Sequence, residues 1–381
     1  MNSQDSGNRV SDIVFINQNS GYLMIDLINS FVEAGYSCIL IAGRIIERGN
    51  PLDPSVKVVK IIKYNRSSVF KRLFTWIVAT LQICLLVKVK YRRERLFIVS
   101  NPPFAALIPL VVRNRYSILI FDVFPDALVD SELFSENSML VKWWKKANSK
   151  VYGAADRLFT ISGSMKRVLQ NYTGSKDVEL IPIWADSKFL KRIKPSDNTF
   201  IEKYNLQGKF VVLYSGNIGL SSQIEALVDI ASLSARENIV FIFIGDGAKL
   251  KWLEQRASET SHKNIMILPW QPAKELSYSL STANLAVVGI DKKASRLAMP
   301  SKLLSYLSVG APILCLANED TELAKFVTEH DVGKVFDASQ SMQISRYIEW
   351  LMDNPRECER LSNKSLFASM QFNSLNAKKF L

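Results

Sequence analysis

The chain has 381 residues, of which 48% are hydrophobic and 22% charged, and its formal net charge is +12. This length exceeds the size at which one hydrophobic core usually stops growing, so two domains are expected, and the composition excludes a disordered arm or a low-complexity tract. The charge is uneven, because residues 1–190 carry 25 Lys and Arg against 16 Asp and Glu, whereas residues 191–381 carry 23 against 20. A basic first half suits an anionic partner such as a membrane surface or a nucleic acid, and equally suits a solvated basic face.

The first twelve residues, MNSQDSGNRVSD, are polar and lack the apolar core of a secretion signal. The four cysteines form no CxxC pair, and with only two histidines the spacing indicates no zinc site. Free thiols and the missing export signal predict a cytoplasmic protein. The longest apolar run, residues 73–87, contains Thr and Gln and is too short to cross a bilayer comfortably.

A strand–helix–strand pattern opens the first half. Residues 12–43 contain an apolar strand, a Gly-bearing loop, a helix with apolar residues at helical spacing from Met24 to Val32, and a second apolar strand. Such a unit builds a parallel sheet whose ligands lie at the carboxyl ends of the strands. More buried strands are predicted at residues 56–62, 96–100, 117–122 and 157–162.

Residues 68–90 predict a long helix that is apolar on two sides, with basic residues at both ends. Such a helix is either buried on both sides or faces lipid on one. We interpret it as a core helix with a solvated basic end; the alternative is a helix resting on an anionic bilayer. One stripe consists of Phe70, Leu73, Phe74, Ile77, Leu81, Cys84 and Leu85, and the other of Trp76, Ile83 and Val87.

The second half repeats the strand–helix–strand pattern at residues 209–247. Ser222 and Glu225 have the spacing of a capping box, which predicts the start of its helix. The polar segment 191–208 separates the halves and is predicted to be the linker. The fold class is therefore α/β, with two doubly wound, Rossmann-like domains facing across a cleft. Further strands are predicted at residues 265–268, 285–290 and 312–316.

Two loops of the second half are candidates for phosphate binding. Gly216 and Gly219, in YSGNIGLSS, let the backbone turn between a strand and a helix with its N–H groups outward. In MPSKLLSYL, Pro300 suits the first turn of a helix, and Lys302 adds a cation where the helix dipole is already positive, which indicates an anionic ligand. Arg296 adds charge before this helix. Either loop can equally be a routine structural turn.

Other loops follow strands and carry polar or aromatic side chains. Asp246 lies in the strand-to-helix turn of GDGAKLKWLEQRA, and Trp270 of LPWQP can cover a nucleobase or anchor its loop. In FDVFPDAL, Asp122 and Asp126 can accept hydrogen bonds from sugar hydroxyls, act as acid and base, or cap the following turn.

Seven segments along the chain resemble, in sequence and in order, those of the GT-B glycosyltransferases of family 4, which are retaining enzymes that use sugar nucleotides. The resemblance covers most of the chain and is strongest to the bacterial branch that builds O-antigen, capsule and colanic acid. The segments are SNPPFAAL, FDVFPDAL, YGAADRLFTISGSMKRVL, LYSGNIG, FIGDGAKLKWLE, LPWQPAKELSYSLSTANLAVV and MPSKLLSYLSVGAPIL.

The resemblance implies an acceptor-binding domain at residues 1–190, a linker region at 191–208, a nucleotide-sugar-binding domain at 209–360 and a C-terminal helix at 361–381 that crosses back to the first domain. Asp122 and Lys302 are the implied catalytic residues, and Gly21 and Asp126 would lie on the acceptor side. The donor-binding residues would be Gly216, Asn217, Gly219, Asp246, Trp270, Gln271, Arg296, Pro300, Ser301, Leu303 and Ser305.

This chain departs from the family pattern at several positions. Two glutamates eight residues apart correspond to Leu297 and Ser305, and a basic pair after the first C-terminal strand is missing. A histidine common before the Asp of the N-terminal strand is replaced by Phe121. Lys302 and Arg296 would therefore carry more of the phosphate neutralisation.

The predicted function is retaining transfer of a hexosyl or N-acetylhexosaminyl group from a nucleotide-diphosphate sugar to a lipid-linked saccharide in surface polysaccharide biosynthesis. No metal or other cofactor is required, and the protein would be peripheral at the inner face of the plasma membrane, on an anionic surface. The alternative is a non-catalytic GT-B-like partner or scaffold subunit, suggested by the missing glutamates. The basic residues lack the interleaved aromatics of a single-strand groove, so no nucleic-acid partner is predicted.

Overall fold

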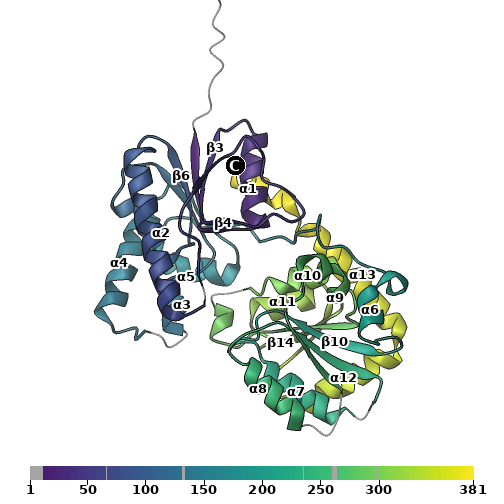
Figure 1. The fold of residues 1–381 in the computed structure, drawn as a ribbon. Coiled ribbons are helices and arrows are strands. Elements are labelled where there is room, and N and C mark those ends of the chain that lie inside the picture. The colour runs from purple at the N-terminus through teal and green to yellow at the C-terminus, as the bar shows by residue number, and fades with distance from the viewer. Residues whose placement is uncertain (1–11, 66, 131–133, 235, 260–263, 297–298) are drawn as a thin grey trace, which may run out of the picture. The chain divides into compact units, whose positions relative to one another are not determined.

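The computed structural model of the protein consists of two compact units (Figure 1). The first unit comprises Met1–Ile183 together with Ser374–Leu381, and the second comprises Trp184–Asn373. The structure describes residues 12–65, 67–130, 134–234, 236–259, 264–296 and 299–381.

A seven-stranded parallel sheet forms the centre of the first unit, in the order β5-β3-β1-β6-β7-β8-β9. The chain runs outward from β1 through β3 to β5 and then returns to β6 on the other side of β1, so the topological switch point lies between β1 and β6. The strands are β1 (Ile13–Ile16), β3 (Cys38–Ala42), β5 (Lys57–Lys60), β6 (Arg95–Val99), β7 (Tyr116–Ile120), β8 (Leu158–Thr160) and β9 (Glu179–Leu180). A small pair, β2 (Asn19–Ser20) with β4 (Arg44–Ile45), lies beside this sheet.

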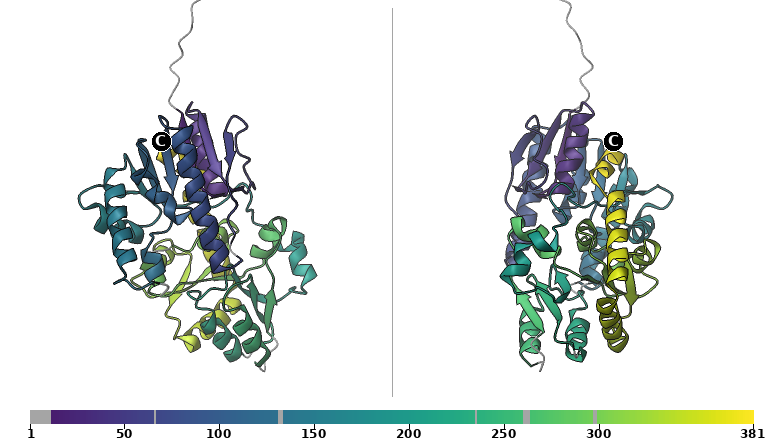
Figure 2. Two further views of the ribbon diagram at one scale, coloured as in Figure 1. Left: turned by 60° about the vertical axis from the view of Figure 1, so that its left-hand side comes forward. Right: turned by 90° about the vertical axis from the view of Figure 1, so that its right-hand side faces the viewer.

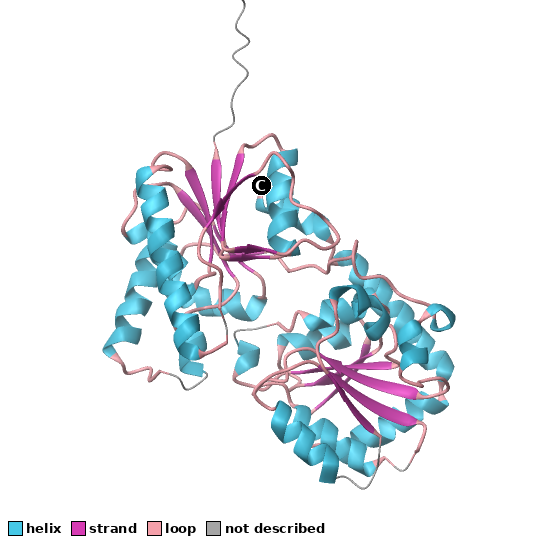
Figure 3. Cartoon of the chain, in the orientation of Figure 1, coloured by secondary structure: helices cyan, strands magenta, loops and turns pink. Residues whose placement is uncertain are grey.

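Helices cover both faces of this sheet, as Figure 3 shows. The strands β1, β3 and β6 are apolar and almost wholly buried, as expected for parallel strands covered on both sides. Figure 2 shows α2 in front of the sheet in its left-hand view. The helices are α1 (Tyr22–Glu33), α2 (Val69–Val89), η1 (Pro103–Leu110), α3 (Asp126–Asp130), α4 (Met139–Ala154), α5 (Gly163–Thr173) and η5 (Ser374–Phe380).

The predicted helix at 68–90 exists as α2, but its interpretation as a core helix is wrong. Of its two apolar stripes, only the smaller one is buried: Ile83 and Val87 of this stripe, and Ala79 beside them, are shielded from solvent. Most side chains of the larger stripe, which runs from Phe70 to Leu85, are exposed to solvent. A single layer of contacts on one side of a surface helix can cover only one of two apolar stripes.

A six-stranded parallel sheet forms the centre of the second unit, in the order β12-β11-β10-β13-β14-β15. Its switch point lies between β10 and β13, since the chain runs from β10 outward to β12 and returns to β13. The buried core gathers apolar side chains of the sheet and of the helices on one of its faces. The strands are β10 (Phe210–Ser215), β11 (Ile239–Ile244), β12 (Ile265–Leu268), β13 (Leu285–Gly289), β14 (Ile313–Leu316) and β15 (Gly333–Phe336).

The helix after β10 starts differently from the capping-box prediction, which is wrong. α7 begins at Ile224 and is preceded by Gln223 in a left-handed conformation with no side-chain cap. The Ser222 hydroxyl instead donates to the Gly219 carbonyl oxygen at 2.6 Å, and Glu225 pairs with Lys249. The helices of this unit are η2 (Pro195–Asp197), α6 (Thr199–Lys203), α7 (Ile224–Leu233), α8 (Leu250–Glu259), η3 (Ala273–Glu275), α9 (Leu276–Leu280), η4 (Ala294–Arg296), α10 (Lys302–Ser308), α11 (Glu322–Glu329), α12 (Ser341–Asp353) and α13 (Pro355–Gln371).

The segment predicted as a linker, residues 191–208, belongs to the second unit, because the division falls between Ile183 and Trp184. Its main chain is bound to α9 and to the residue that caps it: the Lys191 amide donates to Ser277 Oγ at 3.2 Å, and the Ile193 amide to Ser281 Oγ at 3.0 Å.

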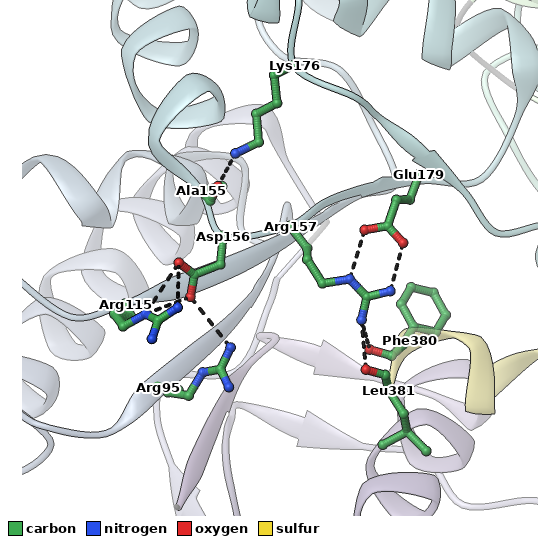
Figure 4. A network of polar contacts seen from close by, with 9 residues as sticks. All are labelled: Arg95, Arg115, Ala155, Asp156, Arg157, Lys176, Glu179, Phe380 and Leu381. Carbon is green, nitrogen blue, oxygen red and sulfur yellow. Dashed lines mark hydrogen bonds and ion pairs between the residues drawn. The ribbon is translucent and has the colours of Figure 1, made fainter.

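The end of the chain returns to the first unit through η5, whereas the predicted C-terminal helix at 361–381 is divided between α13 and η5. Figure 1 shows this segment beside α1, and the Ser30 hydroxyl donates to the Ala377 carbonyl oxygen at 3.2 Å. Figure 4 shows the fork of Arg157, which donates to both oxygens of the Glu179 carboxylate and to the main-chain oxygens of Phe380 and Leu381 at 2.7–2.9 Å. The bidentate pair with Glu179 fixes the orientation of the guanidinium group, which holds the returning segment by its main-chain oxygens.

Candidate active site

The loops of the second unit that carry predicted donor residues leave neighbouring strands at one edge of the sheet. Trp270 follows β12, Asp246 follows β11 and Gly216 follows β10, and these three strands are adjacent. The chain from β13 leads through η4 into α10, which begins at Lys302. The carboxyl edge at the switch point of a doubly wound sheet is the usual ligand position in such folds, and it lies between β10 and β13.

Lys302 lies against the turn after β10. A Cβ added to Gly216 would lie 3.0 Å from Lys302 Nζ, and the same nitrogen is 3.7 Å from the centroid of the Tyr214 ring. Within the described residues the ammonium group has no hydrogen-bond or ion-pair partner, and it lies over the face of this ring. Gly216 and Lys302, which the sequence analysis assigned to two candidate phosphate loops, thus lie next to each other in the folded chain.

The surroundings of Lys302 disfavour its charge. Burial lowers the pKa of this ammonium group to about 7, from the 10.5 of an unperturbed lysine. An anion placed beside it would restore the charged form, because an opposite charge at short range stabilises an ammonium.

Two tyrosines, which sequence reasoning did not single out, hold the turn in place. The buried Tyr306 hydroxyl accepts from the Ser215 amide at 2.6 Å and donates to the Ser215 carbonyl oxygen at 3.2 Å, which joins α10 to the end of β10. Burial raises the pKa of Tyr214 to about 12, so its hydroxyl stays protonated and donates to the Asn217 carbonyl oxygen at 2.6 Å. Tyr306 lies one helical turn beyond Lys302, but nothing in its sequence context indicates the contact.

The turn after β11 packs against the turn after β10. A Cβ at Gly245, which has φ +150°, would lie 2.0 Å from the Gly216 carbonyl oxygen, so only glycine fits there. The Gly216 amide donates to the Ile244 carbonyl oxygen at 2.9 Å, which corrects the expectation that this N–H group points outward. Asp246 is exposed, and its carboxylate accepts from the following amide, of Gly247, at 2.7 Å.

The amides of Asn217 and Gly219 form no hydrogen bond within the part of the chain that the structure describes. A Cβ added to Gly219 would lie 2.6 Å from Asn217 Nδ2, so this side chain covers the turn closely. These two residues remain candidates for contact with an anionic group.

The segment around α10 only partly matches its predicted roles. The helix begins at Lys302 and not at Pro300, whose carbonyl oxygen accepts from the Leu303 amide at 3.1 Å. The Leu303 side chain is fully buried in the core and so cannot line a ligand site. Ser301 is exposed, and Ser305 is partly buried on the next turn of the helix.

Other predicted residues before this helix and after β12 lie at the protein surface. Arg296 ends η4 with an exposed side chain, and Leu297 lies outside the described residues. Trp270 is 48% exposed, so its ring is accessible to a ligand. Gln271 folds back on its own loop, where its amide donates to the Pro269 carbonyl oxygen at 2.8 Å.

In the first unit, Asp122 follows β7 at the carboxyl edge of the sheet. Its side chain is exposed, yet the protein around it desolvates the carboxylate and raises its pKa above the usual value. The Ser100 hydroxyl, at the end of neighbouring β6, accepts from the amides of Phe121 at 2.9 Å and Asp122 at 3.3 Å. Gly21 precedes α1 at the same edge with open space beside it.

Asp126 is built into the fold of the first unit. Its carboxylate accepts from the Tyr172 hydroxyl and lies 3.6 Å from Lys145 Nζ. Because both oxygens already have partners and the side chain is buried, the geometry favours a structural anchor over an acid or base.

The described residues contain no group of three His, Cys, Asp or Glu side chains that could hold a metal ion. The part of the candidate site that the structure brings together consists of Lys302, the glycine turns after β10 and β11, and the main-chain amides of Asn217 and Gly219.

Comparisons with known proteins agree with this architecture. Residues 196–366 match the family described as glycosyl transferases group 1. The chain is 25% identical over 351 residues to WbjE of Pseudomonas aeruginosa, which is named as a glycosyltransferase; the match covers 89% of this chain and 88% of WbjE. It is also 27% identical over 173 residues to WcaI of Escherichia coli K12, which is named as a colanic acid biosynthesis glycosyl transferase. This match covers 45% of this chain and 42% of WcaI.

Among solved structures, HepE of Anabaena in complex with UDP-glucose superposes with a TM-score of 0.69 at 13% identity, covering 97% of this chain and 98% of HepE. The GT-B fold predicted from the sequence, with two Rossmann-like α/β domains, is confirmed.

Proposed function

The protein is a glycosyltransferase with a group 1 domain at residues 196–366, and from this we propose that it transfers a sugar from a nucleotide-diphosphate sugar with retention of configuration. HepE, which shares the fold, is solved with UDP-glucose, and this supports a nucleotide sugar as donor. The switch point of the second sheet would receive the diphosphate of that donor.

The observation that carries the proposal is the ammonium of Lys302 beside the Gly216 turn, which has no partner among the described residues. A diphosphate placed there would meet a cation that no described side chain neutralises, together with the amides of Asn217 and Gly219. Fixed positive groups aimed at a leaving group stabilise the charge that develops as its bond breaks.

The reaction breaks the bond between the anomeric carbon and the diphosphate oxygen and forms a bond from that carbon to an acceptor hydroxyl oxygen. The hydroxyl attacks from the side of the leaving diphosphate, so configuration is retained, and its proton passes to a diphosphate oxygen. Lys302 would hold the departing diphosphate, and Asp122, at the carboxyl edge of the first sheet, would bind hydroxyls of the sugar or acceptor.

The acceptor we propose is a lipid-linked saccharide in bacterial surface polysaccharide biosynthesis, at the inner face of the membrane. The name of WcaI, which refers to colanic acid biosynthesis, supports the pathway. The excess of Lys and Arg in residues 1–190 supports a site next to an anionic surface.

A binding panel tests the donor. Calorimetric titration of UDP-, GDP- and dTDP-sugars into the full chain should identify one class that binds, and Lys302→Met should weaken it at least tenfold, which is about 1.4 kcal/mol. Lys325→Met, which removes an exposed lysine of the same unit, is the matched control and should bind like the unaltered protein. The proposal is wrong if no nucleotide sugar binds, or if Lys302→Met binds as tightly as its control.

We further propose that the reaction requires no metal, because Lys302 supplies the positive charge for the diphosphate. Release of free nucleotide in the presence of membrane lipid extract should then be unchanged by EDTA. Loss of turnover with EDTA and its return with Mg²⁺ would contradict this part alone.

A further inference from the structure

One helix of the first unit presents an apolar strip to solvent. Phe70 is 86% exposed, Phe74 62%, Leu81 64% and Leu85 65%, and Ile77 lies between them with 44% exposed. These five residues of α2, which we call the α2 face, recur at intervals of three or four and so form one continuous strip along the helix. Exposed apolar strips of this extent mark interaction surfaces, since isolated exposed hydrophobic residues are ordinary but aligned ones are not.

The surroundings of the α2 face are basic throughout. No Asp or Glu occurs between residues 67 and 93, whereas six Lys and Arg do. Within the described residues none of these six side chains forms an ion pair, and most of them are exposed. They are Lys71 and Arg72 in the first turn of α2 and Lys88, Lys90, Arg92 and Arg93 around its end. An apolar strip between unneutralised cations matches the acyl chains and phosphates of an anionic lipid surface.

The opposite side of α2 is fixed to the first unit. The buried Gln18 amide donates to the Thr75 carbonyl oxygen at 3.0 Å, and Gln82 Oε1 accepts from the Ile62 amide at 2.8 Å. Phe70–Val89 is the single candidate for a membrane span among the described residues, by length and apolar composition alone. Since a spanning helix would have to break these contacts, α2 can lie on a bilayer with its outer side only.

A second group of exposed apolar residues belongs to α4 and lies at the same edge of the sheet as the start of α2. The first turn of α4 exposes Met139 and Leu140, and Trp143 is exposed at the start of the next turn. α2 connects β5 to β6 and α4 follows β7 toward β8, all parallel strands, so both helices begin at the carboxyl edge of the sheet, where Asp122 lies. Rings join the two helices: Trp76 and Phe124 have centroids 6.3 Å apart, and so do Phe124 and Trp144. Between the two helices lies η1, which packs against both.

From this geometry we propose that the α2 face, assisted by the first turn of α4, docks the first unit on an anionic lipid bilayer, with α2 lying along the membrane surface. The start of α2 would then lie at the bilayer surface, at the same edge of the sheet as Asp122, where a lipid-linked acceptor would be held; this last point rests on the proposed function. The docking itself depends only on the surface of the first unit.

Vesicle co-sedimentation of the full chain tests the docking. Vesicles of phosphatidylcholine with roughly one-third phosphatidylglycerol should bind the protein at least tenfold more tightly than phosphatidylcholine alone, and added salt should weaken this binding. The double variant Leu81→Glu/Leu85→Glu should lose at least tenfold in binding. Phe367→Glu, which alters an equally exposed apolar residue of α13 in the second unit, should bind like the unaltered protein.

The outcomes separate the two proposals. Binding that is equal for the double variant and its control overturns the α2 face as the docking surface. A protein that does not bind anionic vesicles, but forms a dimer that the double variant abolishes, shows a second copy as the occupant and also overturns it. Nucleotide binding by the double variant is expected to be unchanged, so loss of vesicle binding with intact nucleotide binding supports docking. Vesicle binding without any nucleotide binding would instead contradict the proposed function alone.

Discussion

At the scale of single residues, the charge of Lys302 is expected to lower the stability of the ligand-free protein, although the same charge would favour binding of an anionic ligand. Its pKa of about 7 in the folded chain lies below the 10.5 of the unfolded chain, so the unfolded form binds more protons between these values. The cost of keeping the ammonium charged is therefore full below pH 7 and is relieved as pH rises toward 10.5.

We predict that Lys302→Met stabilises the second unit by about 2–4 kcal/mol at pH 6, and by progressively less as the pH approaches 10. Urea unfolding at pH 6 and pH 9 measures the difference, with Lys325→Met as the exposed control that should change stability by less than about 0.5 kcal/mol. A variant that is less stable than the unaltered protein at pH 6 would show that the lysine is not an electrostatic burden.

The same titration predicts how donor binding depends on pH. A diphosphate binds the charged lysine, so affinity should fall as pH rises above 7, by up to about tenfold per pH unit. UDP-glucose is a suitable probe, because both of its phosphates are esterified and do not titrate near neutrality. Calorimetry at pH 6.5 and above, in buffers of different ionisation enthalpy, should also show proton uptake on binding, and a pH-independent affinity would contradict the assignment.

Tyr306 acts on the site through Ser215. Tyr306→Phe leaves the buried Ser215 amide without its 2.6 Å acceptor, which should cost about 1–3 kcal/mol of stability and weaken nucleotide binding. Tyr347→Phe is the matched control in the same unit, since no hydrogen bond of its hydroxyl occurs among the described residues. Thermal unfolding and nucleotide titration of both variants give the comparison; equal effects in the two would argue against a positioning role.

At the scale of elements, the turns after β10 and β11 depend on each other. Gly245→Ala would drive a Cβ to within 2.0 Å of the Gly216 carbonyl oxygen at a φ that disfavours side chains. We expect this variant to be destabilised by more than about 2 kcal/mol and to lose nucleotide binding as a result. Gly153→Ala, within α4 and with open space beside it, should be neutral or stabilise the protein by up to about 1 kcal/mol. Chemical denaturation of the two variants checks both expectations.

At the scale of the whole molecule, the first unit requires a segment that comes from the end of the chain. The Phe380 ring is buried 4.9 Å from the Phe159 ring and 6.0 Å from the Phe97 ring, measured between centroids. Phe380→Ala should therefore destabilise this unit by about 3–5 kcal/mol. Hydrogen exchange should rise in β6 and β8 with nucleotide binding unchanged, whereas the exposed Leu375→Ala should change neither. Uniform destabilisation of both units would contradict this account.

Much of the fold could be predicted because its signals are local. The two strand–helix–strand units at 12–43 and 209–247 follow from apolar periodicity within short segments of the chain, and the order of the motifs along the sequence indicates the GT-B fold. The start of α7 was missed for the opposite reason. Ser222 and Glu225 have capping spacing, but contacts to Gly219 and Lys249 from outside the helix compete for both side chains.

By itself, the sequence determined the two doubly wound domains, the loops that carry Gly216 and Lys302, and a helix with two apolar stripes. The tertiary structure alone decided which stripe of α2 meets solvent, that Tyr306 binds a residue 91 positions away, and that Arg157 holds the chain 223 positions later. Helix and strand formation depend on neighbouring residues, whereas burial and the partner of a polar group depend on segments that meet only after folding.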